Sequence, residues 1–264
     1  MHLLETIVDK LKVGSPLVMG EYSVQKGFTP EQIVWLKGTP NSDFITESVV
    51  DFLPLDALER ENPEVLCRYS GNADYLKSNL MRFLNSDQEN WYSPTHQYDA
   101  PPSRSNVNDR YRAPYDKHYG FMFYFEDYEV ESIQDNDGIK IWLPTYEDFN
   151  GGNKFQLFKR KGTRARGTMD FVYNKGLDFS ESSYVPFWLS NKNDTAGEAY
   201  IMGRNGDLVP QRPVNACGVR PVCNIRPETV VVKDDDGFYH IKPRACKNAF
   251  TDEELFEFLG MAQP

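Results

Sequence analysis

Residues 185–225 constrain the fold of this chain most, because they hold several short apolar runs separated by turn residues. The runs cover residues 187–189, 199–202, 207–209 and 218–225. Between the second and third runs, Asn205-Gly206 offers the positive φ angles that a tight hairpin turn needs. The stretch therefore predicts a small antiparallel sheet.

Three segments of this stretch also carry longer motifs. They are Trp188-Leu189-Ser190, Tyr200-Ile201 with Gly206-Asp207-Leu208, and Gly218-Val219-Arg220-Pro221-Val222. They resemble the closing segments of an uncharacterised family of bacterial and prophage domains with WLRS and GVRPA motifs. That family is associated with the C-type-lectin-like fold of formylglycine-generating enzymes and phage receptor-binding proteins. Ser190 stands where the family has an arginine.

The first third of the chain resembles the same family. Residues 18–22 and 32–37 are similar to its opening strands, and residues 78–85 (SNLMRFLN) are similar to its S-x-L-R-x-x-L-N helix. The resemblance implies an α+β fold with antiparallel sheets, hairpins and peripheral helices. We expect one C-type-lectin-like domain over residues 1–264.

Local patterns predict further elements. Apolar residues at helical spacing favour helices over residues 3–11 and 74–84. Residues 144–149 resemble the short S-x-E-E-A helix of the same family, and Thr145 is a suitable N-cap for it. Asp-Gly turns favour hairpins that join 121–130 to 139–143 and 229–233 to 238–242, and residues 48–53 form a further apolar run. A capping box at residues 251–254 predicts a C-terminal helix over 252–260.

Composition excludes several classes of protein. With 264 residues and 40% hydrophobic content, the chain is typical of globular proteins, and none of its apolar runs approaches the roughly 18 residues of a membrane span. Residues 1–14 lack the features of a signal peptide, which favours the cytoplasm. The net charge of -10 disfavours general binding to nucleic acid. The basic run at 154–166 favours a solvated loop or a patch for an acidic neighbouring subunit over a nucleic-acid site.

Catalytic and metal-binding patterns are weak. The four histidines are scattered, and no familiar catalytic or phosphate-binding motif occurs, so we expect neither an enzyme nor a cofactor. The acidic segments 135–138 and 234–237 begin like calcium loops but lack the closing glutamate, which favours hairpin turns over metal sites.

The cysteines are interpreted as buried thiols. Cys217 and Cys223 lie on one predicted strand, about 20 Å apart if it is extended, which is too far for a disulfide. Formylglycine-generating relatives use a cysteine pair, but core positions are the favoured interpretation here.

Residues 86–120 form the strongest candidate for a binding site. The segment has no helix or strand periodicity and mixes aromatic rings with Ser, Asn and Asp, a composition typical of binding surfaces. Its candidate ligand-binding residues are Trp91, Tyr92, Tyr98, Tyr111, Tyr115 and Tyr119. A loop packed on its own aromatic residues is an equally good alternative.

Arg220 is a further candidate. We expect its guanidinium to tie loop carbonyls or a carboxylate beneath the sheet, and the alternative is that it binds an anionic ligand.

The sequence favours a non-enzymatic binding module, in particular a bacteriophage virion protein for attachment or assembly. Its expected partners are a protein or glycan receptor or neighbouring virion subunits, and a homo-oligomer is compatible with this. The alternatives are an intracellular protein that binds a host protein, and a formylglycine-generating-like oxidase.

Overall fold

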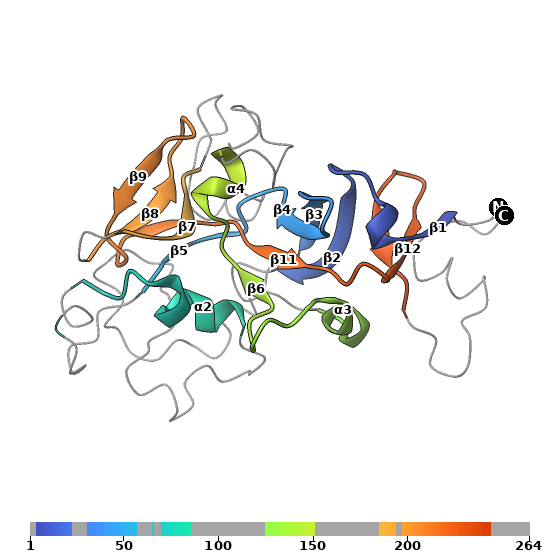
Figure 1. The fold of residues 1–264 in the computed structure, drawn as a ribbon, viewed down its shortest axis with the longest axis horizontal. Coiled ribbons are helices and arrows are strands. Elements are labelled where there is room, and N and C mark those ends of the chain that lie inside the picture. Colours follow the sequence, from blue (N-terminus) through green and yellow to red (C-terminus); the bar gives the residue numbers. More distant parts are fainter. Residues whose placement is uncertain are drawn as a thin grey trace.

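A computed structural model describes residues 4–22, 31–56, 65, 70–85, 125–150, 185–193 and 197–243. Over these residues the chain forms thirteen strands in two sheets, three α-helices and two 3-10 helices. The predicted α+β class is therefore confirmed, with strands predominating. Figure 1 shows the smaller sheet at one end of the molecule and strands β1 and β12 at the other.

The larger sheet has eight strands. In spatial order they are β1 (Leu4–Ile7), β12 (Val230–Lys233), β13 (Tyr239–Ile241), β2 (Pro16–Tyr22), β3 (Glu31–Lys37), β4 (Asp43–Thr46), β11 (Val222–Asn224) and β6 (Ile141–Trp142). Neighbours are antiparallel except β13 and β2, which are parallel. The predicted strands at 18–22 and 32–37 and the predicted hairpin at 229–242 are confirmed.

The smaller sheet has five strands. In spatial order they are β5 (Asp51–Pro54), β10 (Ala216–Val219), β7 (Phe187–Lys192), β8 (Ala199–Met202) and β9 (Leu208–Gln211). The predicted hairpin is confirmed as β8–β9, and Gly203 N–H donates to the Asp207 carbonyl at 2.8 Å across its turn. The prediction of an antiparallel sheet is wrong for β7 and β10, which are parallel. Within the β8–β9 turn only Gly206 has a positive φ, of 80°. The expectation that Asn205 would also be left-handed is therefore wrong.

The prediction of one strand over residues 218–225 is wrong. The chain leaves the smaller sheet after β10 and enters the larger sheet at β11, with Arg220 and Pro221 at the crossing. The segment that joins β4 to β5 makes the same crossing, because β4 pairs with β11 in the larger sheet and β5 pairs with β10 in the smaller sheet. Proline has no N–H to continue a ladder, which favours a break at this point.

The helix predicted over residues 3–11 is also wrong. Residues Leu4–Ile7 form β1, and Val8–Lys10 form the 3-10 helix η1. The backbone of this segment pairs with β12, and Val8 N–H donates to the Thr229 carbonyl at 2.9 Å. The buried Lys37 ammonium binds the Val8 and Asp9 carbonyls at 2.8 and 3.1 Å. These long-range bonds outweigh the helical spacing of the apolar residues.

The strand predicted over residues 121–130, as the first arm of a hairpin with 139–143, is wrong for the residues from 125 onward that the structure describes. Residues Asp127–Ser132 form helix α3, which a Glu126–Glu129 capping box starts. The Asp-Gly turn itself is confirmed, because Asp137 and Gly138 have φ of 55° and 85° and Asn136 bridges to Ile139. The strand after the turn, β6, pairs with β11 instead.

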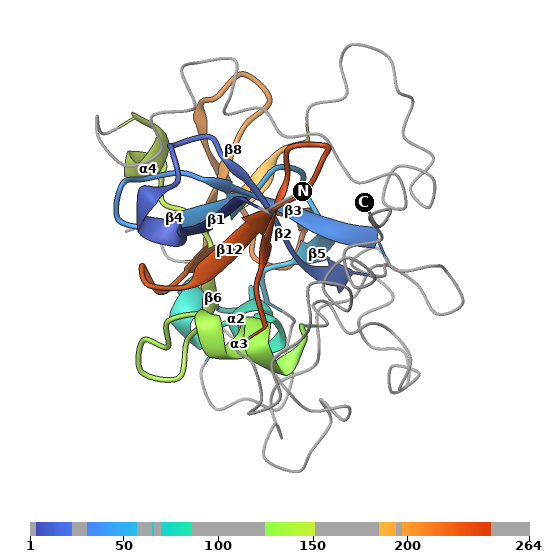
Figure 2. The same cartoon turned by 90° about the vertical axis from the view of Figure 1, so that its right-hand side faces the viewer.

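The other helices agree with the sequence. The predicted helix at 74–84 divides into the 3-10 helix η2 (Tyr75–Lys77) and α2 (Asn79–Leu84), and α4 covers Tyr146–Asn150. Thr145 caps α4 as expected, since its hydroxyl accepts from Asp148 N–H at 3.2 Å. Figures 1 and 2 show α2 and α3 on one side of the sheets and α4 on the other.

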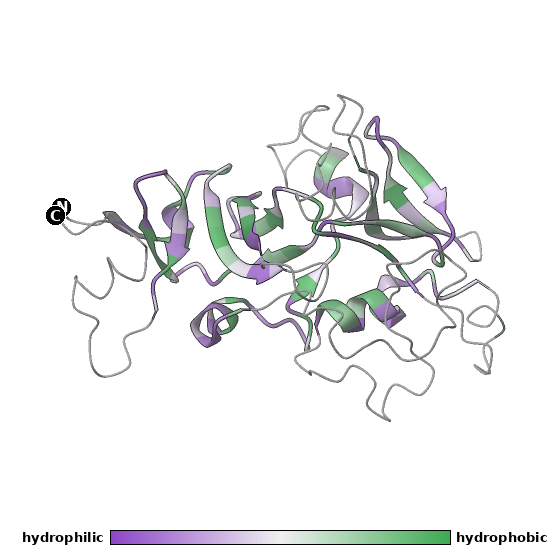
Figure 3. Ribbon diagram, turned by 180° about the vertical axis from the view of Figure 1, so that it is seen from behind, coloured by the Kyte–Doolittle hydropathy of each residue, from purple (hydrophilic) through white to green (hydrophobic). Residues whose placement is uncertain are grey.

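Both sheets contribute to one continuous hydrophobic core. Trp35 and Trp188 are fully buried, and their indole N–H groups donate to the Met19 and Leu53 carbonyls at 2.9 and 2.8 Å. Figure 3 shows apolar residues along the strands of both sheets, whereas α3 is mostly hydrophilic. Both tryptophans therefore belong to the core.

Candidate functional site

The predicted aromatic binding residues, Trp91, Tyr92, Tyr98, Tyr111, Tyr115 and Tyr119, lie outside the described residues. The same holds for the basic run at 154–166 and the C-terminal helix predicted over 252–260. The structure describes the chain up to Asn85, directly before the segment, and again from Phe125; residues 121–124 also lie outside the described part. These positions show how the scaffold holds the chain before the segment and from Phe125 onward.

Asn85 fixes the chain just before the aromatic segment. Its side-chain oxygen accepts from the N–H groups of Lys140 and Ile141 at 2.7 and 2.9 Å. Its side-chain nitrogen donates to the carbonyls of Ile141 and Met81 at 2.8 and 2.9 Å. One amide therefore ties the end of α2 to the exposed edge of β6.

Helix α2 is itself tied to the smaller sheet. The buried Asp56 carboxylate accepts from Asn79 N–H at 2.9 Å and from Asn72 N–H, and Leu80 N–H donates to the Leu55 carbonyl at 3.0 Å. Ser78 provides the N-cap, since its hydroxyl accepts from Met81 N–H at 3.2 Å. These hydrogen bonds hold α2 in place directly before the aromatic segment.

Glu129 fixes the chain on the other side of the segment, where α3 begins. One carboxylate oxygen accepts from Glu126 N–H at 2.9 Å and the other from Gly20 N–H at 3.2 Å. Gly20 has a φ of 70° and lies where the β2–β3 register shifts. Glu129 thereby joins α3 to an irregular part of β2.

Burial governs the protonation of Glu129. Desolvation raises the pKa of its carboxyl above the usual range, and the nearby carboxylates of Glu126 and Glu21 add to this, although the two backbone hydrogen bonds oppose it. Only 8% of the residue is exposed. Its role is to position α3.

Arg220 lies where the chain crosses between the sheets. Its guanidinium donates to the carbonyls of Thr46 and Glu47 at 3.0 and 3.3 Å and lies 5.3 Å from the centre of the Phe187 ring. Burial lowers its pKa to about 9, against the opposing effect of Glu47. The expectation that Arg220 ties loop carbonyls is confirmed. Its role in ligand binding stays a prediction, and 1% of the residue is exposed.

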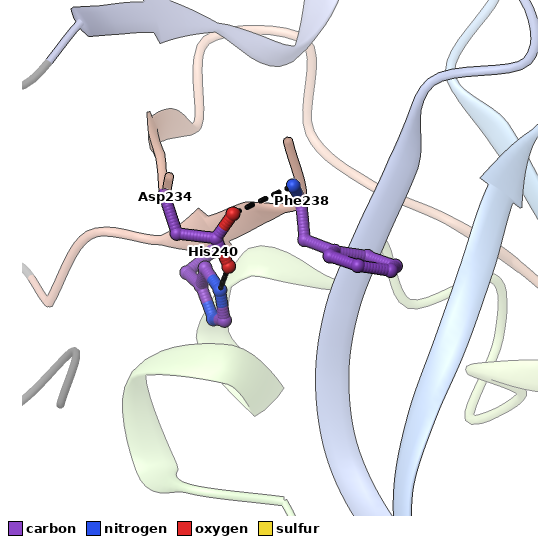
Figure 4. A network of polar contacts seen from close by, with 3 residues as sticks. All are labelled: Asp234, Phe238 and His240. Carbon is purple, nitrogen blue, oxygen red and sulfur yellow. Dashed lines mark hydrogen bonds and ion pairs between the residues drawn. The ribbon is translucent and has the colours of Figure 1, made fainter. Parts of the chain in front are cut away.

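Asp234 and His240 form the pair of polar side chains shown in Figure 4. The Asp234 carboxylate accepts from Phe238 N–H at 2.8 Å, and its other oxygen lies 2.8 Å from His240 Nε2. Partial burial acts to raise the pKa of Asp234, but the bonds from His240 and Phe238 outweigh it and lower the pKa. Both contacts close the turn between β12 and β13, as predicted for residues 234–237.

The two described cysteines occupy core positions. Cys217 lies on β10 and Cys223 on β11, so they belong to different sheets, and both are buried free thiols. Burial raises the pKa of Cys217 to about 12 and that of Cys223 well above its usual range, so both thiols stay protonated. The interpretation as buried thiols is confirmed for this pair.

The structure describes no metal centre among the residues given above, because they include no group of three or more His, Cys, Asp or Glu side chains that could hold an ion. The acidic segment at 135–138 forms a turn as predicted, with Gly138 N–H donating to Asp135 Oδ1 at 2.6 Å.

Sequence reasoning missed the residues that anchor the segment. Asn85 falls within the S-x-L-R-x-x-L-N motif, but the motif does not reveal its partner on β6. Glu126 and Glu129 have the spacing of a capping box, and this signal could have identified α3. Asp56 carries no local signal for its contact with α2.

Comparisons with known proteins found no matching family model, no similar curated protein and no similar solved structure. In the part of the chain that the structure describes, no helix has the length and apolar character needed to cross a membrane.

Proposed function

We propose that this chain is a non-enzymatic binding module with a C-type-lectin-like fold, which a bacteriophage particle uses for attachment or assembly. The motifs at residues 78–85 and 218–222 support the fold, and the composition of residues 86–120 supports the binding role. The partner would be a protein or glycan receptor or a neighbouring virion subunit.

The observation that carries the binding role is the way the aromatic segment is bounded. Asn85 clamps the chain before it to β6, and Glu129 clamps the helix after it to β2. Both α2 and α3 lie on the same side of the molecule (Figures 1 and 2). Binding loops need a rigid base, because ordering a mobile segment on binding costs affinity.

The buried polar groups of the described core support a scaffold role over catalysis. Arg220, Glu129 and Asp56 bind backbone groups and hold elements together. The placement of Cys217 and Cys223 in different sheets supports a binding module over a formylglycine-generating-like oxidase.

Mass spectrometry of purified particles tests the virion role. Particles from the phage or prophage that encodes this chain should contain it in a fixed ratio to the major capsid protein. Absence from the particles would contradict the virion role, and co-purification with a host protein would then favour intracellular binding.

Substitution of the aromatic residues tests the binding role. The double variant Trp91→Ala, Tyr115→Ala should weaken binding of the purified protein to intact host cells about tenfold or more, because buried aromatic anchors dominate interface energies. Leu76→Ala is the control, since this side chain is 56% exposed and belongs to η2, outside the aromatic segment in the sequence. Equal binding by the double variant and the control would contradict the proposal.

A further inference from the structure

Helix α3 is held at its two ends by bonds of different kinds. At its C-terminal end, the Ser132 carbonyl accepts from Arg226 N–H and Gln134 N–H donates to the Asn224 carbonyl, each at 2.8 Å. These backbone bonds join the end of the helix to β11 and to the chain that follows it. At its N-terminal end, the side chain of Glu129 binds the backbone of β2. One of the bonds that hold the start of α3 therefore comes from an ionisable group.

A bulge in β2 supplies the partner of Glu129. The β2–β3 register shifts between Val18 and Glu21, so two residues of β2 lie opposite one residue of β3. Gly20 lies within this bulge and has a φ of 70°, which glycine adopts readily. Its N–H donates to a Glu129 carboxylate oxygen at 3.2 Å. The bulge thus directs a backbone donor of the sheet toward α3.

Three carboxyl groups act on one another at this contact. Glu129 is 8% exposed, and Glu126 from α3 and Glu21 from β2 both disfavour its negative charge. Tyr128 is the further titratable neighbour on α3, and burial raises the pKa of its phenol well above the usual range, so that it stays neutral. In the described part of the chain, no basic side chain offsets the charge of Glu129.

Two backbone hydrogen bonds oppose these effects. The N–H groups of Glu126 and Gly20 donate to the carboxylate at 2.9 and 3.2 Å and favour its ionised form. Desolvation is the largest influence, and together with the two neighbouring carboxylates it raises the pKa of Glu129 above its usual range in spite of these bonds. A neutral carboxyl keeps a carbonyl oxygen that can still accept from an N–H group.

The direction of the pH effect follows from the raised pKa. While α3 is docked, Glu129 holds its proton to a higher pH than an exposed glutamate does. The docked form therefore binds more protons in the interval between the two pKa values. The resulting stabilisation is present in full below the usual pKa of glutamate, and it is lost as the pH rises through the raised pKa.

We propose that the contact between α3 and β2 is pH-sensitive, so that it is strengthened when Glu129 is protonated and weakened when Glu129 is ionised. The backbone bonds of Ser132 and Gln134 do not titrate, so the C-terminal end of the helix stays attached at either pH. The device thus changes how firmly the start of α3 is held and leaves the core unchanged. The inference does not depend on the proposed function.

Amide hydrogen exchange of the isotope-labelled full chain, followed by NMR, tests the proposal. The reporters are the amides of Gly20 and Val130, of which the second donates to the Glu126 carbonyl at 3.0 Å within α3. After correction for intrinsic exchange rates, their protection should fall about threefold or more between about pH 4 and about pH 7. The Gln134 amide is the internal reference, and its protection should not follow this change.

Three variants assign the effect to Glu129. Glu129→Gln is uncharged at every pH and should remove the pH dependence at Gly20 and Val130. Glu21→Gln removes one neighbouring charge and should move the loss of protection to lower pH. Glu131→Gln is the matched control, because Glu131 is an exposed carboxylate on the same helix, and this variant should keep the profile of the unmodified protein.

Several results would overturn the proposal. Protection at Gly20 and Val130 that rises with pH would mean that the hydrogen bonds to the carboxylate outweigh its burial. A parallel change at Gln134 would show a change in overall stability and not in this contact. The same profile in Glu129→Gln as in the unmodified protein would assign the effect to another group. If Glu129→Gln does not form α3, Glu21→Gln still decides, because a profile equal to that of Glu131→Gln would contradict the proposed role of the neighbouring charge.

Discussion

Glycine is required at position 218 because there is no room for a side chain, and not because of its backbone conformation. A Cβ atom at this position would lie 2.5 Å from the Pro186 carbonyl oxygen and 3.0 and 3.1 Å from methyl groups of Val49 and Val185. The same carbonyl accepts from Gly218 N–H at 2.9 Å and from the Cys217 thiol at 3.2 Å. The close approach of β10 and β7 therefore depends on the missing side chain.

Gly218→Ala should lower the free energy of unfolding by roughly 2–3 kcal/mol, because the backbone of Pro186 must move to make room. Gly138→Ala is the matched control: Gly138 has a φ of +85°, but no atom lies within 4 Å of an added Cβ. That variant should lose only about 1 kcal/mol, from backbone strain. Urea denaturation measures both, and a larger loss for Gly138→Ala would disprove the steric argument.

At the scale of elements, the side chain of Asn85 takes the place of a neighbouring strand. Strand β6 is the outer strand of the larger sheet as far as the structure describes it, so none of the described strands pairs with one side of its backbone. Asn85 pairs with the N–H and carbonyl of Ile141 as a neighbouring strand would. It thereby covers an exposed edge and fixes α2 against the sheet at once.

Asn85→Ala should lower the free energy of unfolding by roughly 1–3 kcal/mol, because the backbone N–H groups of Lys140 and Ile141 lose their acceptor. The Ile141 amide should exchange its hydrogen faster in the same variant. Asn85→Asp keeps the acceptor but not the donor, so it should retain much of the protection at Ile141. Unchanged exchange at Ile141 in Asn85→Ala would contradict this role.

Strands with strong local signals could be predicted from the sequence. Strand β3 contains Ile33, Val34 and Trp35, and the β8–β9 and β12–β13 hairpins have glycine in their turns. In each case the pattern and the turn chemistry agree. The helix α2 was predictable for the same reason, since its Ser78 cap and apolar spacing point to one structure.

The failures arose where distant partners decide the structure. Residues Leu4–Ile7 have helical spacing, but they pair with β12 far along the chain. The anchors could not be read from local patterns either: Asn85 and Ile141 are 56 residues apart, and Arg220 and Thr46 are 174 apart. Residue types that suit buried contacts can be recognised, whereas the identity of the partner depends on the completed fold.

At the scale of the whole molecule, the two sheets form one structural unit. The hydrophobic core runs through both without interruption. Arg220 binds the Thr46 carbonyl at the end of β4 and lies over Phe187 of β7, so it contacts both sheets. Two chain segments also cross side by side from one sheet to the other, one between β4 and β5 and one between β10 and β11.

The sheets should therefore unfold in one transition. Trp35 reports on the larger sheet and Trp188 on the smaller, and both are fully buried. In the protein labelled with 5-fluorotryptophan, their fluorine signals, assigned with Trp35→Phe and Trp188→Phe, should disappear at the same urea concentration. Separate midpoints would show that the sheets are independent folding units.

The pairing of β1 with β12 also sets a limit on how early the fold can be completed during synthesis. Leu4 lies opposite Lys233, so almost all of the described chain must leave the ribosome before the outermost strand of the larger sheet finds its neighbour. Such distant pairings are associated with slow folding, because a long loop must close before the contact stabilises it. A nascent chain of this kind exposes unpaired strands for much of its translation, which gives molecular chaperones a long period in which to bind it.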